Sequence, residues 1–184
     1  MAANLASGNL ASGAGAAREE GERHTISVLV ENRPGVLARV SGLFARRGFN
    51  IDSLAVCATE DPAVSRMTVV TRGDSAQLEQ IVKQLDKLVD VITILDHTHD
   101  ALVEREIALI KVRATVDNRN EIMQLAAIFH ATVDHISPKE ETMILEVTGE
   151  TNGVDAFLET LAKFQIQELV RTGTIAMVRG GRST

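Results

Sequence analysis

Aromatic residues are scarce in this sequence, which has five Phe but no Trp and no Tyr among its 184 residues. Proteins that bind single-stranded nucleic acid stack the bases on exposed aromatic rings beside basic groups. The formal net charge of -6 also repels a phosphate backbone. These shortages exclude nucleic acid as an expected partner.

Cysteine occurs only once, as Cys57, so an internal disulfide framework is excluded. The neighbours of Cys57 are mostly apolar and strand-like, and no helix start or electropositive setting is evident that would activate a thiolate. We therefore expect Cys57 to be a small core residue rather than a nucleophile.

Long hydrophobic runs are also missing, because no apolar stretch approaches the roughly 20 residues that cross a bilayer. The sequence therefore predicts a soluble protein with no membrane contact. We expect a cytoplasmic location, and a plastid location is also compatible with the sequence.

Residues 1–23 form a segment rich in small residues, with a near-repeat of Asn-Leu-Ala-Ser-Gly that ends at Gly13. Such a segment buries too little apolar surface to offset the entropy lost on ordering. We expect it to be a disordered tail.

From His24 onward, the spacing of apolar residues predicts two copies of a βαββαβ unit. In the first copy we expect strands at 25–31, 50–58, 65–72 and 91–95, and helices at 35–47 and from 75 onward. In the second copy we expect strands at 107–115, 132–137 and 142–148, one strand within 169–178, and helices at 119–129 and 153–164. The capping pairs predicted at two helix starts are Asp74 with Gln77 and Asn118 with Glu121.

The predicted fold class is α+β, with two tandem ferredoxin-like domains. We expect the first domain to span 24–98 and the second to span 104–180. A polar linker at 99–103 is expected to join them.

The turn Asn32-Arg33-Pro34-Gly35 between the first strand and the first helix predicts a binding site for a small zwitterion. Pro34 pre-sets the backbone near the helix start, and Gly35 removes the side chain that would keep a ligand from the free amides there. These amides suit a carboxylate, and the side chain of Asn32 suits an ammonium group.

A simpler alternative is that Gly35 only eases a tight turn. The second copy has Asn118-Arg119-Asn120 at the matching position, so a bulky side chain replaces the glycine there. We therefore expect the second turn to admit a ligand poorly.

Further residues carry a family resemblance through most of the chain. They are TISVLVENRPGVL at 25–37, LFARRGFNIDSL at 43–54, SRMT at 65–68, QLDKLVDV at 84–91, VEREIALIKV at 103–112 and ELVRTG at 168–173. With this combination, residues 24–180 closely resemble the regulatory (small) subunit of acetohydroxyacid synthase, also called acetolactate synthase.

The resemblance implies an N-terminal ACT domain and a C-terminal ferredoxin-like domain, in a homodimer that binds the catalytic (large) subunit. That partner carries thiamine diphosphate, Mg²⁺ and FAD, and joins two pyruvates, or pyruvate and 2-oxobutyrate, at the start of valine, leucine and isoleucine synthesis. The small subunit is implied to have no catalytic residues and no cofactor of its own. It is implied to activate the partner and to confer feedback inhibition, typically by valine.

The resemblance also implies an effector site shared between two chains. One chain contributes its turn and the partner chain contributes the segment after its first helix, so that the site consists of Asn32, Pro34, Gly35, Val36 and Leu37 with Asn50 and Ile51. The amides at 35–37 are expected to bind the carboxylate of a branched-chain amino acid, and the two Asn side chains its ammonium group. Apolar neighbours around Val36 and Ile51 enclose its side chain.

Two other classes of function remain compatible with the sequence. A stand-alone tandem ACT sensor that acts through another protein partner would leave an acetohydroxyacid synthase catalytic subunit unaffected on mixing. If the chain were an enzyme, it would turn over pyruvate without a partner subunit. Yet no phosphate loop, nucleophile elbow or HExxH motif occurs. Only His97 and His99 lie close together among the histidines, and further metal ligands are not evident, so we expect no metal site and assign the pair to a solvated linker.

Overall fold

Alternating apolar residues form the centre of the first domain in the computed structural model, which describes residues 21–181. Ile26, Val28 and Val30 of strand β1 (Glu22–Glu31) have no exposed surface. β1 pairs antiparallel with β3 (Val64–Gly73) on one side and with β4 (Val91–Asp96) on the other. The edge strand β2 (Ser53–Ala58) pairs with β3, so the sheet order is β2-β3-β1-β4.

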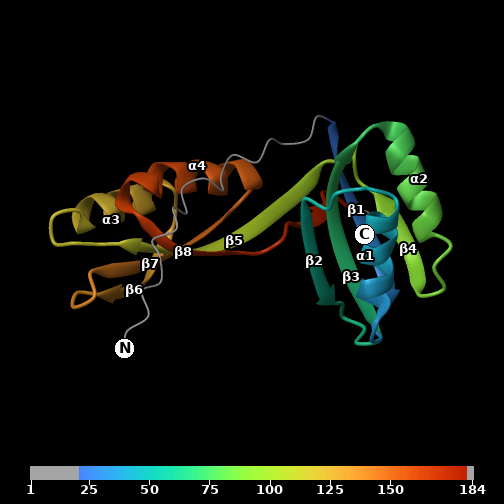
Figure 1. Cartoon of the computed structure of the whole chain (residues 1–184), viewed down its shortest axis with the longest axis horizontal. Coiled ribbons are helices and arrows are strands. Elements are labelled where there is room, and N and C mark those ends of the chain that lie inside the picture. The colour runs from blue at the N-terminus through green and yellow to red at the C-terminus, as the bar shows by residue number, and fades with distance from the viewer. Residues whose placement is uncertain (1–20, 182–184) are drawn as a thin grey trace, which may run out of the picture.

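Two helices cover one face of this sheet (Figure 1). They are α1 (Val36–Arg46) and α2 (Ser75–Leu85), whose buried residues join β1 and β3 in one core. α1 is followed by Gly48 with a φ of 70°, a left-handed conformation that suits glycine after a helix end. α2 begins with the predicted capping box, because the amide of Gln77 donates to Asp74 Oδ1 and the amide of Asp74 donates to Gln77 Oε1. The predicted capping of α2 by Asp74 and Gln77 is confirmed.

The second domain repeats the arrangement with a core of its own. Its sheet has the order β6-β7-β5-β8. When the strands are numbered within each domain, both sheets have the order second, third, first, fourth. The strands are β5 (Leu102–Arg113), β6 (Thr132–Ser137), β7 (Thr142–Gly149) and β8 (Ile166–Arg171), and the helices are α3 (Arg119–Ile128), α4 (Thr151–Leu161) and a 3-10 turn (Ala162–Phe164). The predicted α+β fold of two ferredoxin-like units is confirmed.

Matching irregularities support an internal repeat. The ladder between β1 and β4 shifts register between Leu29 and Val30. The ladder between β5 and β8 shifts between Lys111 and Val112, the corresponding place in the second sheet. A bulge retained at the same point in both copies is a property of the shared unit.

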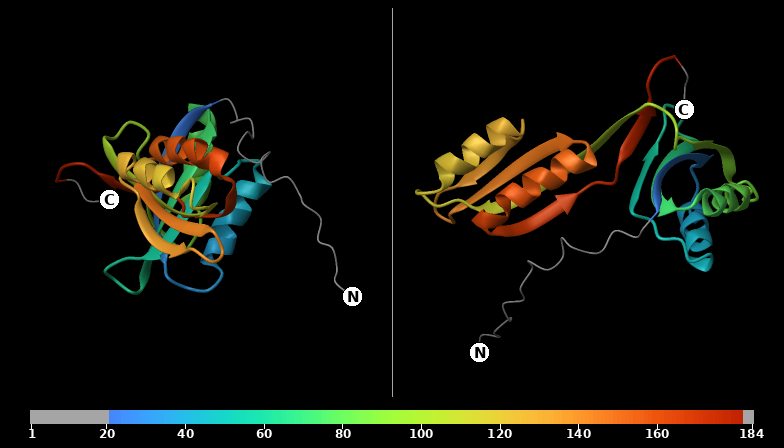
Figure 2. Two further views of the ribbon diagram at one scale, coloured as in Figure 1. Left: turned by 90° about the vertical axis from the view of Figure 1, so that its left-hand side faces the viewer. Right: turned by 90° about the horizontal axis from the view of Figure 1, so that it is seen from above.

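The end of the chain differs from the prediction. Instead of one strand within 169–178, β8 ends at Arg171 and a separate strand β9 (Ile175–Val178) follows. β9 pairs with residues 102–105 of β5, so β5 belongs to the second sheet over its later part and to a two-stranded ribbon over its first part. Figure 2 shows β5 and the returning chain running together between the domains. The prediction was wrong because a single apolar pattern cannot reveal that the chain changes partners along one strand.

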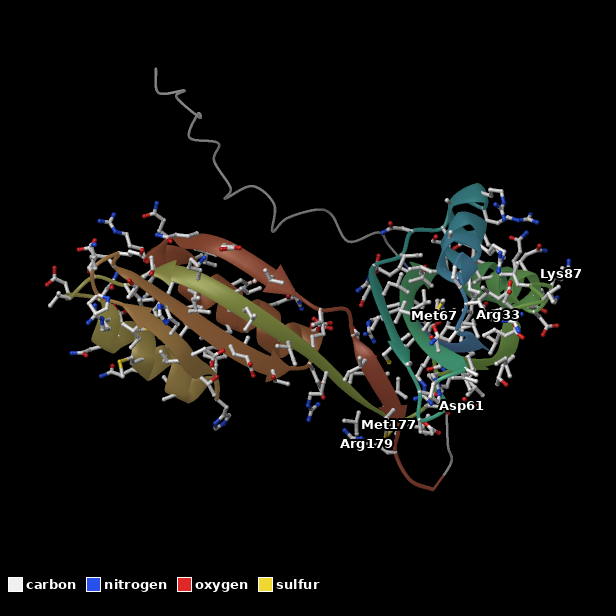
Figure 3. The ribbon with its side chains drawn as sticks, turned by 90° about the horizontal axis from the view of Figure 1, so that it is seen from below. Arg33, Asp61, Met67, Lys87, Met177 and Arg179 are labelled. Carbon is white, nitrogen blue, oxygen red and sulfur yellow. The ribbon has the colours of Figure 1, made fainter. Side chains whose placement is uncertain are left out.

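The ribbon of β5 and β9 lies against the first sheet, and Met177 and Arg179 of the returning segment lie beside the first domain (Figure 3). Thr25 and Ser27 point away from the helices yet are only 2% and 1% exposed. Thr25 Oγ1 donates to Glu104 Oε1 of β5 at 3.1 Å. This face of the sheet is therefore partly covered by the ribbon.

Gly173, between β8 and β9, lies directly against the backbone of β2 in the first domain. A Cβ atom added there would overlap the carbonyl group of Leu54 in β2. Only a glycine fits against this backbone.

Several local expectations need correction. β1 includes Glu22 and Arg23, which we expected in the tail, while residues 1–20 lie outside the described part of the chain. β5 begins at Leu102, inside the expected linker. Asn118 does not cap α3 with its side chain, because its Nδ2 donates to the carbonyl of Arg113 instead.

Cys57 was also assigned wrongly to the core. It is exposed because β2 is the edge strand, and its later residues, Val56 to Ala58, are all exposed. An apolar strand pattern alone does not distinguish an edge strand from a central one.

We predict that Asp74→Ala lowers the free energy of unfolding by about 1 kcal/mol, because the cap of α2 loses its acceptor. Urea unfolding measures the change. Asp74→Asn keeps a side-chain carbonyl at the cap and should stay close to the wild type. Equal losses in the two variants would mean that the charge, rather than the cap, stabilises the helix.

Candidate functional site

The turn after β1 has the backbone conformation that its sequence indicated. Gly35 has a φ of 86° and precedes α1 as its N-cap residue, and Pro34 lies one position earlier. Any residue with a side chain is strained at this φ, although Asn and Asp tolerate it best. The turn residues Asn32 to Gly35 are exposed, whereas Val36 is buried in the core.

Backbone donors are available at the start of α1. The amide of Val36 donates to the carbonyl of Arg33 at 3.4 Å, which is a long bond. No side chain caps this helix start. Within residues 21–181, the amides of Gly35, Leu37 and Ala38 donate to no backbone acceptor. The donors at this helix start are therefore suited to a carboxylate, with Ala38 as one that we did not predict.

The two predicted Asn side chains are engaged locally. Asn32 Nδ2 donates to the carbonyl of Pro62 at 2.9 Å, so its side-chain oxygen is directed elsewhere. Asn50 Nδ2 donates to Asp52 Oδ1 at 3.0 Å. The carbonyl oxygen of each amide is the group that accepts from an ammonium.

One chain does not bring all predicted site residues together. The turn at 32–37 precedes α1 and the segment Asn50-Ile51 follows it, and α1 is 11 residues long. Its ends are therefore about 16 Å apart. A ligand as small as an amino acid cannot contact both segments of one chain.

Asn50 and Ile51 instead line a groove between the two domains, with a volume of about 890 Å³. The opposite wall comes from β5, the start of α4 and the connection between β8 and β9. A buried carboxylate, Glu106 of β5, lies at the base of this wall and is only 5% exposed.

Three side chains donate hydrogen bonds to Glu106. Thr151 Oγ1 and Thr174 Oγ1 each donate to Oε1 at 2.6 Å, and Arg171 Nε donates to Oε2 at 2.7 Å. Arg171 also donates to Asp155 Oδ1 at 2.6 Å. Burial raises the pKa of Glu106, but the hydrogen bonds from Thr151, Thr174 and Arg171 outweigh burial and hold the pKa below its ordinary value. Glu106 is therefore ionised at neutral pH.

The prediction for His97 was wrong. Its side chain is 1% exposed, with Nε2 at 3.1 Å from Ser27 Oγ and Nδ1 at 2.9 Å from Asp100 Oδ2. The order of atoms resembles a nucleophile, a base and an orienting acid, but Ser27 is 1% exposed in the centre of a sheet. A buried hydroxyl cannot attack a substrate, so this cluster fixes the end of β4 against β1.

Sequence reasoning missed the cluster around Glu106, although a signal was present. Glu106 alternates with Ala108, Ile110 and Val112, which are completely buried, and a carboxylate on such a face requires partners. Within residues 21–181, no three His, Cys, Asp or Glu side chains are placed to hold a metal ion. Every helix in that range is too short or too polar to cross a bilayer.

Comparisons with known proteins agree on one family. The model described as AHAS small subunit-like ACT domain matches residues 26–93, and the model described as small subunit of acetolactate synthase matches 105–180. A probable acetolactate synthase small subunit of Archaeoglobus fulgidus is 50% identical over 160 residues, which is 87% of this chain and 99% of the relative. The acetolactate synthase small subunit of Mycolicibacterium smegmatis is 48% identical over 86% of this chain and 92% of the relative.

A solved structure is similar over the same range. The crystal structure of the acetolactate synthase small subunit from Thermotoga maritima has a TM-score of 0.79 and 42% identity. The match covers 87% of this chain and 99% of that one.

We predict that Glu106→Gln flattens the dependence of stability on acid pH. The folded-state pKa of Glu106 is lowered, so the carboxylate contributes stability above its unfolded pKa of about 4.3, and this is lost as the pH falls through the folded value. Urea unfolding between about pH 7 and pH 3 should show a steeper loss in the wild type. At neutral pH the variant should lose about 3 kcal/mol, because Arg171 loses a buried partner.

The exposed residue Glu159 provides the control for this measurement. Glu159→Gln should follow the wild type throughout. Identical acid profiles for Glu106→Gln and the wild type would contradict the assignment.

Proposed function

We propose, from the premise that this chain belongs to the acetolactate synthase small-subunit family, that it activates the catalytic large subunit and makes it sensitive to valine or another branched-chain amino acid. The chain is a small subunit, so the catalytic reaction and its cofactors, thiamine diphosphate, Mg²⁺ and FAD, are assigned to the large subunit. In this proposal residues 24–98 bind the effector and residues 104–180 form the second regulatory domain.

The observation that carries the proposal is the helix start at Gly35. Its left-handed backbone and exposed position leave the amides of Leu37 and Ala38 open to a carboxylate. A helix N-terminus carries about half a positive charge, which favours an anion there.

The separation of the predicted residues supports a homodimer. Because α1 keeps Asn50 and Ile51 far from the turn at 32–37 in one chain, a complete site requires these residues from a second copy. Ile51 is half-buried and packs against the core, so it presents a fixed apolar surface. In the proposed dimer, this surface encloses the aliphatic side chain of the effector.

Regulation then follows from differential binding. An effector that bridges two chains stabilises the arrangement of domains in which the two halves of the site are closest. The large subunit responds only if its affinity or activity differs between that arrangement and the other. No further chemistry is needed in the small subunit.

We predict that Gly35→Asp abolishes valine inhibition of the mixed enzyme, while activation survives. A carboxylate at this position repels the carboxylate of the ligand, and like charges placed together cost several kcal/mol, so the Kd for valine should rise at least about tenfold. Steady-state assays with the large subunit and calorimetry with valine, leucine, isoleucine and alanine measure these effects.

Gly35→Asn is the matched control, because Asn has the same shape and similar tolerance of a positive φ without the charge. It should keep more of the valine response than Gly35→Asp. Loss of activation and inhibition together in both variants would show that this glycine is required for the fold. A wild-type mixture unaffected in rate and in valine response would favour a sensor that acts through another partner.

We predict that Asn50→Ala weakens valine binding by about 1–3 kcal/mol, because a buried hydrogen bond to the ammonium group is lost. Asn152 lies on the opposite wall of the groove and is not one of the proposed site residues, so Asn152→Ala should bind valine normally. Calorimetry on both variants measures the difference. Equal affinities for the two variants would remove Asn50 from the site.

A further inference from the structure

A chain of hydrogen bonds begins beside the proposed effector site and crosses into the second domain. Ser53 is the first residue of β2 and follows Ile51 by two positions. The amide of Thr174 donates to Ser53 Oγ at 2.7 Å, and Ser53 Oγ donates to Thr174 Oγ1 at 3.3 Å. Thr174 Oγ1 then donates to Glu106 Oε1 at 2.6 Å.

The donor and the acceptor of each hydrogen bond in this chain can be assigned. The carboxylate of Glu106 can only accept, so the hydroxyl of Thr174 donates to it and must accept from Ser53. Thr174 is 1% exposed and Glu106 is 5% exposed, so water does not replace either partner. Displacement of Ser53 therefore leaves the amide of Thr174 without its acceptor and the hydroxyl of Thr174 without its donor, and both losses are unfavourable in a buried position.

On the far side, Glu106 is connected to helix α4. Arg171 joins Glu106 to Asp155, and Thr151 at the start of α4 donates to Glu106. A shift of the carboxylate consequently acts on α4 through Arg171, which is paired with both Glu106 and Asp155, and through Thr151 in the first turn of the helix. A continuous series of side-chain hydrogen bonds thus links β2 to α4 of the second domain.

Close backbone packing reinforces the link. Gly173 adjoins Thr174 and lies against the carbonyl of Leu54, the residue after Ser53. Since no space separates these two backbones, β2 cannot move toward the second domain without displacing the connection between β8 and β9.

We propose that the hydrogen-bond chain from Ser53 through Thr174 to Glu106 couples effector occupancy in the first domain to the position of α4 in the second. This inference rests on the proposed function, because it takes the segment Asn50-Ile51 as part of the effector site. The effector biases the position of β2, and the hydrogen-bond chain makes one relative arrangement of the domains more favourable. Ser53, Thr174 and Glu106 are positioning residues that do not contact the effector.

Another contact between the domains provides a comparison. Arg23 donates to Glu104 Oε1 at 2.9 Å and links β1 to β5, but its side chain is 31% exposed and that of Glu104 is 19% exposed. This ion pair tethers the domains without passing through β2. Removing it should affect the junction without interrupting the coupling.

The test uses the full chain mixed with the large subunit. Thr174→Val removes the hydroxyl at nearly constant shape, Thr174→Ser retains it, Ser53→Ala interrupts the chain at its other end, and Arg23→Gln removes the separate ion pair. For each variant, calorimetry with valine gives the Kd on the small subunit alone. Steady-state assays give the inhibition of the mixture at saturating valine, and circular dichroism verifies folding.

The expected result is a separation of binding from response. Thr174→Val and Ser53→Ala should have a Kd for valine within about twofold of the wild-type value. Their inhibition at saturating valine should nevertheless be at least about fivefold weaker, which is within the usual range of coupling between sites. Thr174→Ser and Arg23→Gln should be inhibited like the wild type. A purely structural role would lower thermal stability and leave inhibition intact.

The outcomes distinguish the two proposals. Full inhibition of folded Thr174→Val and Ser53→Ala would overturn the coupling while leaving the proposed function in place. If Thr174→Val does not fold, Ser53→Ala alone decides, since it makes the smaller change. A wild-type mixture that neither binds nor responds to valine would overturn the proposed function and with it this inference.

Discussion

The structure depends on one strand, β5, that leads from the first domain into the second. β5 pairs with β7 and β8 over its later part and with β9 over its beginning. A strand that is hydrogen-bonded along its length resists bending, because a bend breaks ladder bonds that are costly to lose in the interior. Glu106 lies where the strand changes partners, and the three side chains that donate to it, from Thr151, Thr174 and Arg171, fix this transition. The domains are therefore connected by an element of defined geometry rather than by a loose segment.

The two copies of the unit have diverged at their first turns. In the first copy, Gly35 leaves the helix start open, and its amides lack side-chain partners. In the second copy, Asn118 and Arg119 occupy the same position, and the Asn118 side chain bonds back to Arg113. Neither helix start is capped by a side chain, but the second turn carries bulky residues where the first has Gly35, so only the first turn leaves room for a ligand beside its amides. The proposed division between a binding domain and a responding domain follows from this difference.

Local patterns in the sequence predicted the fold well. The alternation around Ile26 and the helical spacing in α1 reflect burial, which dominates the energetics of each element. The turn at Gly35 was recognised because a positive φ restricts residue choice to a few types. Contacts such as Ser53 with Thr174 join residues 121 positions apart, and no local pattern encodes them. The predictions for Cys57 and His97 were wrong for the same reason, since the exposure of each residue depends on which segments cover a strand.

The edge position of β2 has a practical consequence. Cys57 is the only thiol in the sequence and is exposed on this strand, four residues beyond Ser53. A fluorescent or spin label attached there would occupy a single defined location without any engineered cysteine. Its spectrum would report directly on the surroundings of β2, and so on whether a second molecule shields that margin of the sheet in solution.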